Sequence, residues 1–320
     1  MQNTRTSNGH HAQQLQPALA RLIQNVRQAV VIDPTKLELI VVALLAKGHV
    51  LLEDVPGIGK TLVAKAIAGS LHGTFRRVQC TPDLLPSDIT GGAIYNQREG
   101  RFDFVPGPIF GNIVLVDEIN RASPRTQSSL LESMAEGQVT VDGVTHALPQ
   151  PFCLMATQNP IEMAGTFPLP EAQLDRFLLM LGLGYPDFAD EVSILEREAH
   201  ADPLAALTPV LSLEDVVALQ ASARAVEVAR SLKEYIVSVT SATRAHADVV
   251  VGVSPRGGVA LQKCAQAMAL MRGRAFVTPD DIKTVAPAVL VHRLLTRDRR
   301  PATAQAVIAD LLTATRVPVE

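Results

Sequence analysis

A glycine-rich segment around residue 57 carries the residue types that bind phosphate. It reads Asp54-Val-Pro-Gly-Ile-Gly-Lys-Thr61, between an apolar run typical of a strand and a helical pattern over residues 60–71. In that arrangement, backbone N–H groups and the positive end of the helix dipole surround phosphate oxygens. Lys60 would reach the β- and γ-phosphates of a nucleotide, and Thr61 would ligate Mg²⁺. The predicted nucleotide-binding residues are Pro56, Gly57, Ile58, Gly59, Lys60, Thr61 and Leu62.

Two adjacent acids end a second apolar run, Asn112-Ile-Val-Leu-Val-Asp117-Glu118. A buried strand that delivers carboxylates at its carboxyl end is what a Mg²⁺ site beside a phosphate loop requires. We expect Asp117 to hold the metal, directly or through water, and Glu118 to orient and deprotonate an attacking water. The pair is a weak motif by itself, because strands often end in acids, and gains its meaning from the phosphate loop.

A third apolar run ends in Ala156-Thr-Gln-Asn159-Pro160. An amide at this strand end, beside the acids, could hydrogen-bond the γ-phosphate and the attacking water. Asn159 could equally begin a turn before Pro160, and the spacing alone slightly favours that simpler interpretation.

The elements that must position these residues follow an α/β pattern. Short apolar runs alternate with helical segments between residues 50 and 184, which predicts a parallel sheet covered by helices on both faces. The candidate strands are residues 49–53, 77–80, 112–117, 152–157 and 177–181. A helix over residues 34–45, capped by Asp33 or Thr35, is predicted before the first strand.

Two hairpins interrupt this pattern. Residues 138–145 alternate in polarity around Asp142-Gly143, a dipeptide that adopts the left-handed angles of a tight turn. Residues 92–104 form a second candidate hairpin, with a polar turn that ends at Gly100.

After Tyr185-Pro186 the pattern changes to helices alone, with helix starts at Ser212, Ser254 and Thr278. We therefore expect a disordered tail over residues 1–16, a nucleotide-binding core over 17–190 and a small all-helical domain over 191–320.

Composition narrows the function classes. A chain of 320 residues fits one large or two ordinary domains, and 29 basic against 32 acidic residues, a net charge of −3, make nucleic acid an improbable partner. The longest apolar runs are shorter than a membrane helix, and the first 16 residues have no apolar core typical of an export signal. Three widely spaced cysteines suggest neither a disulfide framework nor a zinc site. A cytoplasmic protein is the simple expectation.

Taken together, the motifs resemble the MoxR family of AAA+ ATPases over about residues 25–315. The motifs that carry the resemblance are residues 53–61, 116–122, 127–140 and 156–160, and Leu-Pro-Glu-Ala-Gln-Leu-Asp-Arg-Phe over 169–177. The resemblance implies an αβα ATPase core with a parallel five-stranded sheet and a helical lid. It also implies Mg²⁺-dependent ATP hydrolysis, a ring that is typically a hexamer, and chaperone-like remodelling or maturation of a protein client. A protein with a von Willebrand factor A domain is a frequent partner in the family.

The resemblance also assigns individual roles. Lys60 and Thr61 match Walker A, Asp117 and Glu118 match Walker B, Asn159 matches sensor 1, Arg176 matches the arginine finger and Arg256 matches sensor 2. Without the family resemblance, Arg176 would be interpreted as a surface ion-pair residue. Arg256 would be a solvated cation, disfavoured by the dipole at the start of a helix unless a γ-phosphate across the domain cleft offsets that cost.

Some positions depart from the usual family pattern, and some segments allow two interpretations. Asp54 replaces the usual first glycine of the phosphate loop, and residues 30–33 lack the Gly-Gln often found in the family, which leaves adenine contacts undefined. The 92–104 hairpin resembles the helix-2 insert of this clade and either touches a client or packs as structure. The basic run at residues 293–300 is expected to be a solvated surface. The alternative functions are the motor of a metal chelatase and a slow ATP-gated assembly scaffold.

Overall fold

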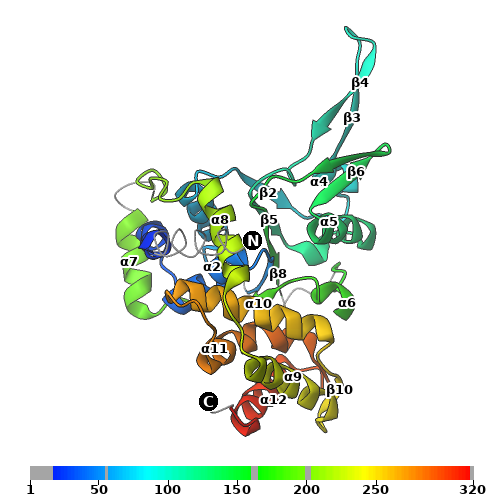
Figure 1. The fold of residues 1–320 in the computed structure, drawn as a ribbon. Coiled ribbons are helices and arrows are strands. Elements are labelled where there is room, and N and C mark those ends of the chain that lie inside the picture. Colours follow the sequence, from blue (N-terminus) through cyan, green and yellow to red (C-terminus); the bar gives the residue numbers. More distant parts are fainter. Residues whose placement is uncertain (1–16, 55–56, 160–164, 199–202, 318–320) are drawn as a thin grey trace, which may run out of the picture.

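A computed structural model describes residues 17–54, 57–159, 165–198 and 203–317. In it, an α/β core lies between a helical domain and two projecting β-hairpins (Figure 1). The predicted tail over residues 1–16 lies outside the described residues. Within the described parts of the chain, no helix is both long and apolar enough to cross a membrane.

The predicted parallel sheet is confirmed, with five strands in the order β2-β5-β8-β1-β9. The strands are β1 (Val50–Glu53), β2 (Phe75–Gln79), β5 (Ile113–Asp117), β8 (Cys153–Gln158) and β9 (Leu179–Leu181). Every pairing in the sheet is parallel, so the carboxyl ends of β5, β8 and β1 lie together at one edge. β5 is buried throughout, as its apolar sequence predicts, whereas the edge strand β2 leaves Arg76 and Arg77 exposed.

Side chains alternate between two apolar layers, as the twofold period of a strand requires. Val50 and Leu52 face the layer that contains α2 (Pro34–Leu45) and α3 (Lys60–Ser70), whereas Leu51 faces the layer of α4 (Pro86–Thr90) and α5 (Pro124–Glu136). Residues 17–29 are also helical. The Asp33 side chain caps α2 by accepting a hydrogen bond from the Thr35 backbone N–H at 2.8 Å, which confirms one of the two predicted caps.

Both predicted hairpins form. One pairs β3 (Gly91–Asn96) with β4 (Arg101–Pro106), and the other pairs β6 (Gln138–Val141) with β7 (Val144–Ala147). Asp142 and Gly143 have φ values of 50° and 80°, the left-handed angles that the Asp-Gly sequence predicts. The two hairpins project from the same side of the core (Figure 1).

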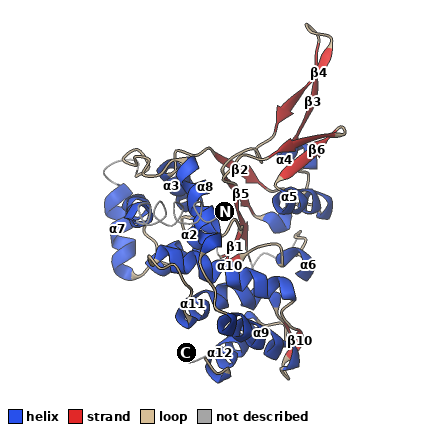
Figure 2. Ribbon diagram, viewed as in Figure 1, coloured by secondary structure: helices blue, strands red, loops and turns tan. Residues whose placement is uncertain are grey.

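The C-terminal part is mostly helical (Figure 2). Its elements are α7 (Phe188–Glu198), α8 (Leu213–Ala225), α9 (Arg230–Ala245), α10 (Pro255–Met271), α11 (Pro279–Leu290), the 3-10 turn η2 (Val291–Arg293) and α12 (Pro301–Ala314). Ser212 and Thr278 begin their helices with capping boxes, as predicted.

The expectation of helices alone needs one correction, because β10 (Val249–Val251) and β11 (Leu295–Thr296) form a short antiparallel pair. Segments this short lack a periodic signal and pair only after the helices bring them together. One apolar cluster runs from the sheet through α2 into α8, α10 and α11. The division at residue 190 stays a prediction.

Candidate functional site

The glycine-rich turn has the geometry of an anion cradle. Gly57 and Gly59 have φ values of 87° and 84°, which side-chain-bearing residues rarely adopt. α3 begins at Lys60, directly after Gly59, so the backbone N–H groups of its first turn and the positive end of its dipole lie at the loop. The Lys60 ammonium donates to the Asp54 carbonyl at 2.9 Å. Of the predicted nucleotide-binding residues, Pro56 lies outside the described residues.

The two predicted acids lie close to Lys60. Burial lowers the pKa of Lys60, and the charges of Asp54, Asp117 and Glu118 act against that shift. Burial raises the pKa of the Cys80 thiol to about 12, and Asp117 and Glu118 add to the rise. The effect on Lys60 requires the carboxylates to lie near the start of α3, and the effect on Cys80 requires them to lie near the end of β2. The strand end and the phosphate loop therefore meet, as the two motifs predict.

Asp117 is held by two neighbouring strands. Its Oδ1 accepts from the Thr157 hydroxyl at 3.2 Å, and its Oδ2 accepts from Arg77 Nε at 2.7 Å. Gln79 of β2 lies opposite Asp117 of β5, and Arg77, two residues before Gln79 on β2, therefore reaches the Asp117 carboxylate. Sequence reasoning missed Arg77. The basic residues in an otherwise apolar strand were its only signal.

Glu118 has an unusual backbone, with φ 57° and ψ 51°. A non-glycine residue in the left-handed region is strained, and such residues cluster at functional sites. Its N–H donates to the Thr157 hydroxyl at 2.9 Å, and its carboxylate pairs with Arg121 at 3.1 Å. The strained turn directs the chain away from the strand immediately after Asp117. No sequence pattern indicated it.

Asn159 lies at the same edge of the sheet. It follows β8, which pairs with β5 on one side and β1 on the other, so the amide lies between the acidic strand end and the phosphate loop. Asn159 is half-buried, and its carbonyl is 3.5 Å from Asn120 Nδ2. The structure thus brings Asn159 together with the residues beside which it was predicted to act.

Arg176 lies at the opposite edge of the sheet, where the amino ends of the parallel strands lie. Leu178, directly before β9, lies beside His49, directly before β1, and the Leu178 N–H donates to the His49 carbonyl at 2.9 Å. Asp54, where the phosphate loop begins, is five residues further along, which is about 16 Å of extended strand. Arg176 is exposed and pairs with no carboxylate of the described residues.

Arg256, in the first turn of α10, lies near Asp175, the residue before Arg176. Its Nη1 atom is 3.8 Å from Asp175 Oδ2, and the side chain is mostly exposed. It was expected to reach a phosphate across the cleft between its own two domains. The structure does not bring it there, because its contact is with the amino edge of the sheet.

The basic run at residues 293–300 is exposed at Arg297, Arg299 and Arg300, as expected, but Arg293 is an exception. Its side chain is only 3% exposed, and its Nε donates to Asp175 Oδ1 at 2.7 Å. Further hydrogen bonds reach the carbonyls of Phe177, Leu178 and Val289. Burial lowers the pKa of Arg293, and Asp175 opposes the shift. The buried cation ties the helical domain to the start of β9, a role that only tertiary packing reveals.

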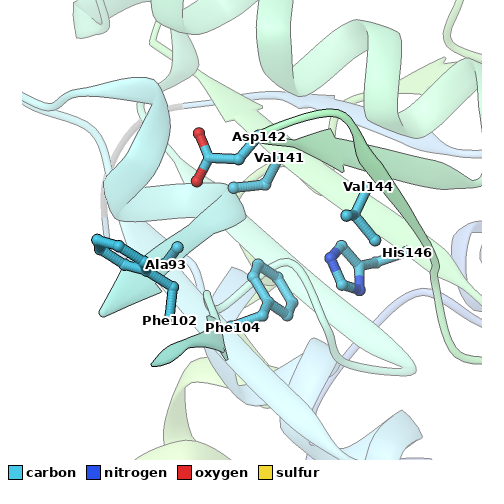
Figure 3. Close-up of a pocket in the computed structure, with 7 residues that line it drawn as sticks. All are labelled: Ala93, Phe102, Phe104, Val141, Asp142, Val144 and His146. Carbon is cyan, nitrogen blue, oxygen red and sulfur yellow. The ribbon is translucent and has the colours of Figure 1, made fainter. Parts of the chain in front are cut away.

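A hollow lies between the two hairpins, away from the phosphate loop. It measures about 600 Å³ and is lined by Ala93, Phe102, Phe104, Val141, Asp142, Val144 and His146. The rings of Phe104 and His146 stack at 3.9 Å between centroids. Figure 3 shows side chains of both hairpins facing this space. Its lining is apolar apart from Asp142 and His146.

A metal at the phosphate loop would have few protein ligands. No group of three His, Cys, Asp or Glu side chains within the described ranges is arranged to hold an ion. Mg²⁺ commonly binds through one or two side chains plus substrate phosphates, so Thr61 and Asp117 fit that mode. Both Asp117 oxygens already accept hydrogen bonds, which favours contact through water.

The fold and the convergence of these motifs define an AAA+ ATPase. Residues 49–179 match the model of the ATPase family associated with various cellular activities, and residues 241–311 match the AAA lid domain. Chaperone MoxR1 of Mycobacterium tuberculosis is 44% identical over 87% of this chain and 75% of its own. The chain belongs to the MoxR family.

Two further similarities cover almost the whole chain. The uncharacterized protein YeaC of Bacillus subtilis is 49% identical over 97% of this chain and 98% of its own. A crystal structure from Cytophaga hutchinsonii, of a protein assigned as an ATPase, has a TM-score of 0.92 at 35% identity and covers 99% of both chains. This chain thus shares its fold, core and helical lid together, with that solved structure.

Proposed function

We propose that this protein binds ATP and Mg²⁺, hydrolyses ATP in a ring, and uses the cycle to remodel or mature a protein client. The observation that carries the proposal is the division of the predicted site between two edges of one sheet. The phosphate loop, Asp117, Glu118 and Asn159 lie at the carboxyl edge, and Arg176 and Arg256 lie at the amino edge. One subunit alone holds an incomplete site.

ATP would bind through its phosphates at the turn over residues 57–62, where backbone N–H groups at the start of α3 and the Lys60 ammonium meet the negative charge. Mg²⁺ would be held by Thr61 and Asp117, and when bound it neutralises charge on the phosphates. The hydrogen bonds from Arg77 and Thr157 hold the Asp117 carboxylate in a fixed orientation.

Glu118 is the candidate base for hydrolysis. Its carboxylate follows Asp117 directly and lies near Lys60, so it can accept a proton from a water aligned with the γ-phosphate. Asn159, one strand further, would hydrogen-bond that water or the γ-phosphate. The strained backbone of Glu118 fits a residue that the surrounding structure holds in place for chemistry.

Arg176 and Arg256 would serve the neighbouring subunit. A cation at the γ-phosphate stabilises the charge that develops as the bond breaks. Asp175 pairs with Arg256 and with Arg293, both on the C-terminal helical part, so these contacts hold that part against the start of β9. Nucleotide state at one site can then change the position of the next subunit's lid. We propose the division into a core over residues 17–190 and a lid over 191–320 on this basis, with six subunits as the family resemblance implies.

The hairpins are the candidate contact for a client. They project from the core and carry exposed Ile94, Tyr95 and Phe102, and the hollow between them accepts an apolar side chain. The name of the mycobacterial relative, a chaperone, supports a protein substrate. A partner with a von Willebrand factor A domain and a cytoplasmic location remain part of the proposal.

An ATPase assay over a range of protein concentrations tests the proposal. If the site is completed between subunits, turnover per subunit rises with concentration and reaches a plateau, and Arg176→Ala removes the rise while ATP still binds. Turnover per subunit that is independent of concentration, in a protein that stays monomeric, would contradict it. Metal insertion with a chelatase partner, or hydrolysis too slow to drive repeated cycles, would favour the alternative functions.

A further inference from the structure

Helix α7 presents its apolar side chains to solvent. Phe188, Val192 and Leu195 follow the i, i+4, i+7 spacing of one helix face, and Phe188 and Leu195 are 85% and 73% exposed. Asp190 and Ser193, on the opposite face, are half-buried. An amphipathic helix normally buries its apolar face, so this inverted orientation indicates a surface that another polypeptide covers. We call Phe188, Val192 and Leu195 the α7 stripe.

The α7 stripe lies on the phosphate-loop side of the molecule. The Gly184 N–H donates to Asp54 Oδ2 at 2.7 Å, and Lys36 Nζ donates to the Leu183 carbonyl. Asp54 begins the phosphate loop, and α7 begins four residues after Gly184. Tyr185, in the connection, is also largely exposed. The start of α7 therefore lies close to the first residue of the phosphate loop.

Exposed apolar side chains also occur on the arginine side, on three elements of the helical part. Val237 of α9, Val250 and Val251 of β10, and Val259 of α10 are each at least half exposed. We call these four residues the lid patch. Val259 is three residues from Arg256, on the same helix. Figure 1 shows α7 on the opposite side of the molecule from β10 and α9.

We propose that the α7 stripe of one subunit packs against the lid patch of the next copy of this chain. The proposal rests on the proposed function, because the contact follows from Arg256 reaching the neighbour's nucleotide. Two different surfaces on opposite sides make a head-to-tail contact, which closes into a ring and leaves neither surface exposed. Exposed Glu191 and Glu196 flank the stripe, and Arg256 borders the lid patch, so the charges are complementary. The same carboxylates disfavour an anionic membrane as the occupant.

The test blocks each surface separately. Leu195→Glu places a charge in the α7 stripe, with Phe188→Glu as a second variant, and Val251→Glu does the same in the lid patch. Phe102→Glu, at the equally exposed hairpin, is the matched control. Assembly is measured by mass photometry with Mg²⁺ and a slowly hydrolysed ATP analogue, and thermal unfolding checks that each variant is folded.

We expect Leu195→Glu and Val251→Glu each to raise the concentration of half-assembly by about tenfold or more, because a charge buried in an apolar contact is costly. Phe102→Glu should assemble like the unmodified protein. A mixture of the two blocked variants should form one-to-one dimers and no ring, because one intact stripe still meets one intact patch.

Three other results overturn the inference. Dimers of Val251→Glu alone would show that two α7 stripes pair with each other. Normal assembly of both α7 variants would show that some other partner covers the stripe. In both cases the ring of the proposed function stands. A protein that binds the nucleotide analogue yet stays monomeric at every concentration would overturn the ring as well.

Discussion

The imidazole of His49 makes the fold sensitive to acid. The ring is buried, its Nδ1 accepts from the Leu154 N–H at 3.0 Å, and its Nε2 lies 3.0 Å from the Met134 carbonyl. Only a neutral ring with the proton on Nε2 satisfies both contacts. Burial lowers the pKa of His49 to about 4, and the bond to Met134 opposes the shift.

The sign and size of the effect follow from this pKa. The unfolded chain takes up a proton near pH 6.5 and the folded chain does not, so stability is complete above that pH and falls as the pH drops toward 4. With a pKa of 6.5 in the unfolded chain and about 4 in the folded chain, His49 should lower the unfolding free energy by about 1.3 kcal/mol between pH 7.5 and 5.5. Between pH 7.5 and pH 4 its contribution should fall by about 3 kcal/mol. His292, whose pKa burial also lowers, acts in the same direction.

Urea unfolding across this range isolates the contribution of His49. His49→Gln should be less stable than the unmodified protein at pH 7.5, because a packed ring and its two contacts are lost. The difference between the two proteins should shrink by about 1.3 kcal/mol at pH 5.5, since the variant has no proton to bind at this position. A constant difference from pH 7.5 to 5.5 would refute the reasoning.

Three further predictions concern single side chains. Lys60→Ala should abolish most ATP binding and leave the fold intact, and unchanged affinity by calorimetry would remove the phosphate loop from its role. Glu118→Gln should bind ATP but turn over about 10² times more slowly, so near-normal turnover in a phosphate-release assay would exclude it as the base. Arg293→Leu leaves Asp175 without its buried partner, and we expect a loss of about 3 kcal/mol in unfolding free energy. Equal urea midpoints would show that the pair contributes nothing.

Features with a local cause were predictable. The Asp142-Gly143 turn, the capping boxes at Ser212 and Thr278 and the glycine pair of the phosphate loop depend on a few neighbouring residues. Adjacent side chains alone set the backbone angles there, so the sequence contains the whole cause. The strands followed from their continuous apolar runs, although β2 begins two residues earlier than predicted, at Phe75.

Features that depend on tertiary packing could not be predicted from the sequence. Arg293 has the sequence context of a surface residue, and only the approach of η2 to β9 buries it. Arg77 is paired because the strand order places β2 beside β5. The direction of Arg256 depends on how the lid lies against the core. None of these arrangements has a periodic or motif signal.

The most direct test of a site shared between subunits mixes two inactive variants. Lys60→Ala cannot bind ATP but carries an intact Arg176, and Arg176→Ala binds ATP but offers no arginine to its neighbour. Because the two residues lie at opposite edges of the sheet, a mixed ring contains pockets in which an intact phosphate loop meets an intact arginine. ATPase activity should therefore be partly restored on mixing, by an amount that depends on the subunit ratio. Co-assembly demonstrated by mass measurement, with activity no higher than that of either variant alone, would contradict a site shared between subunits.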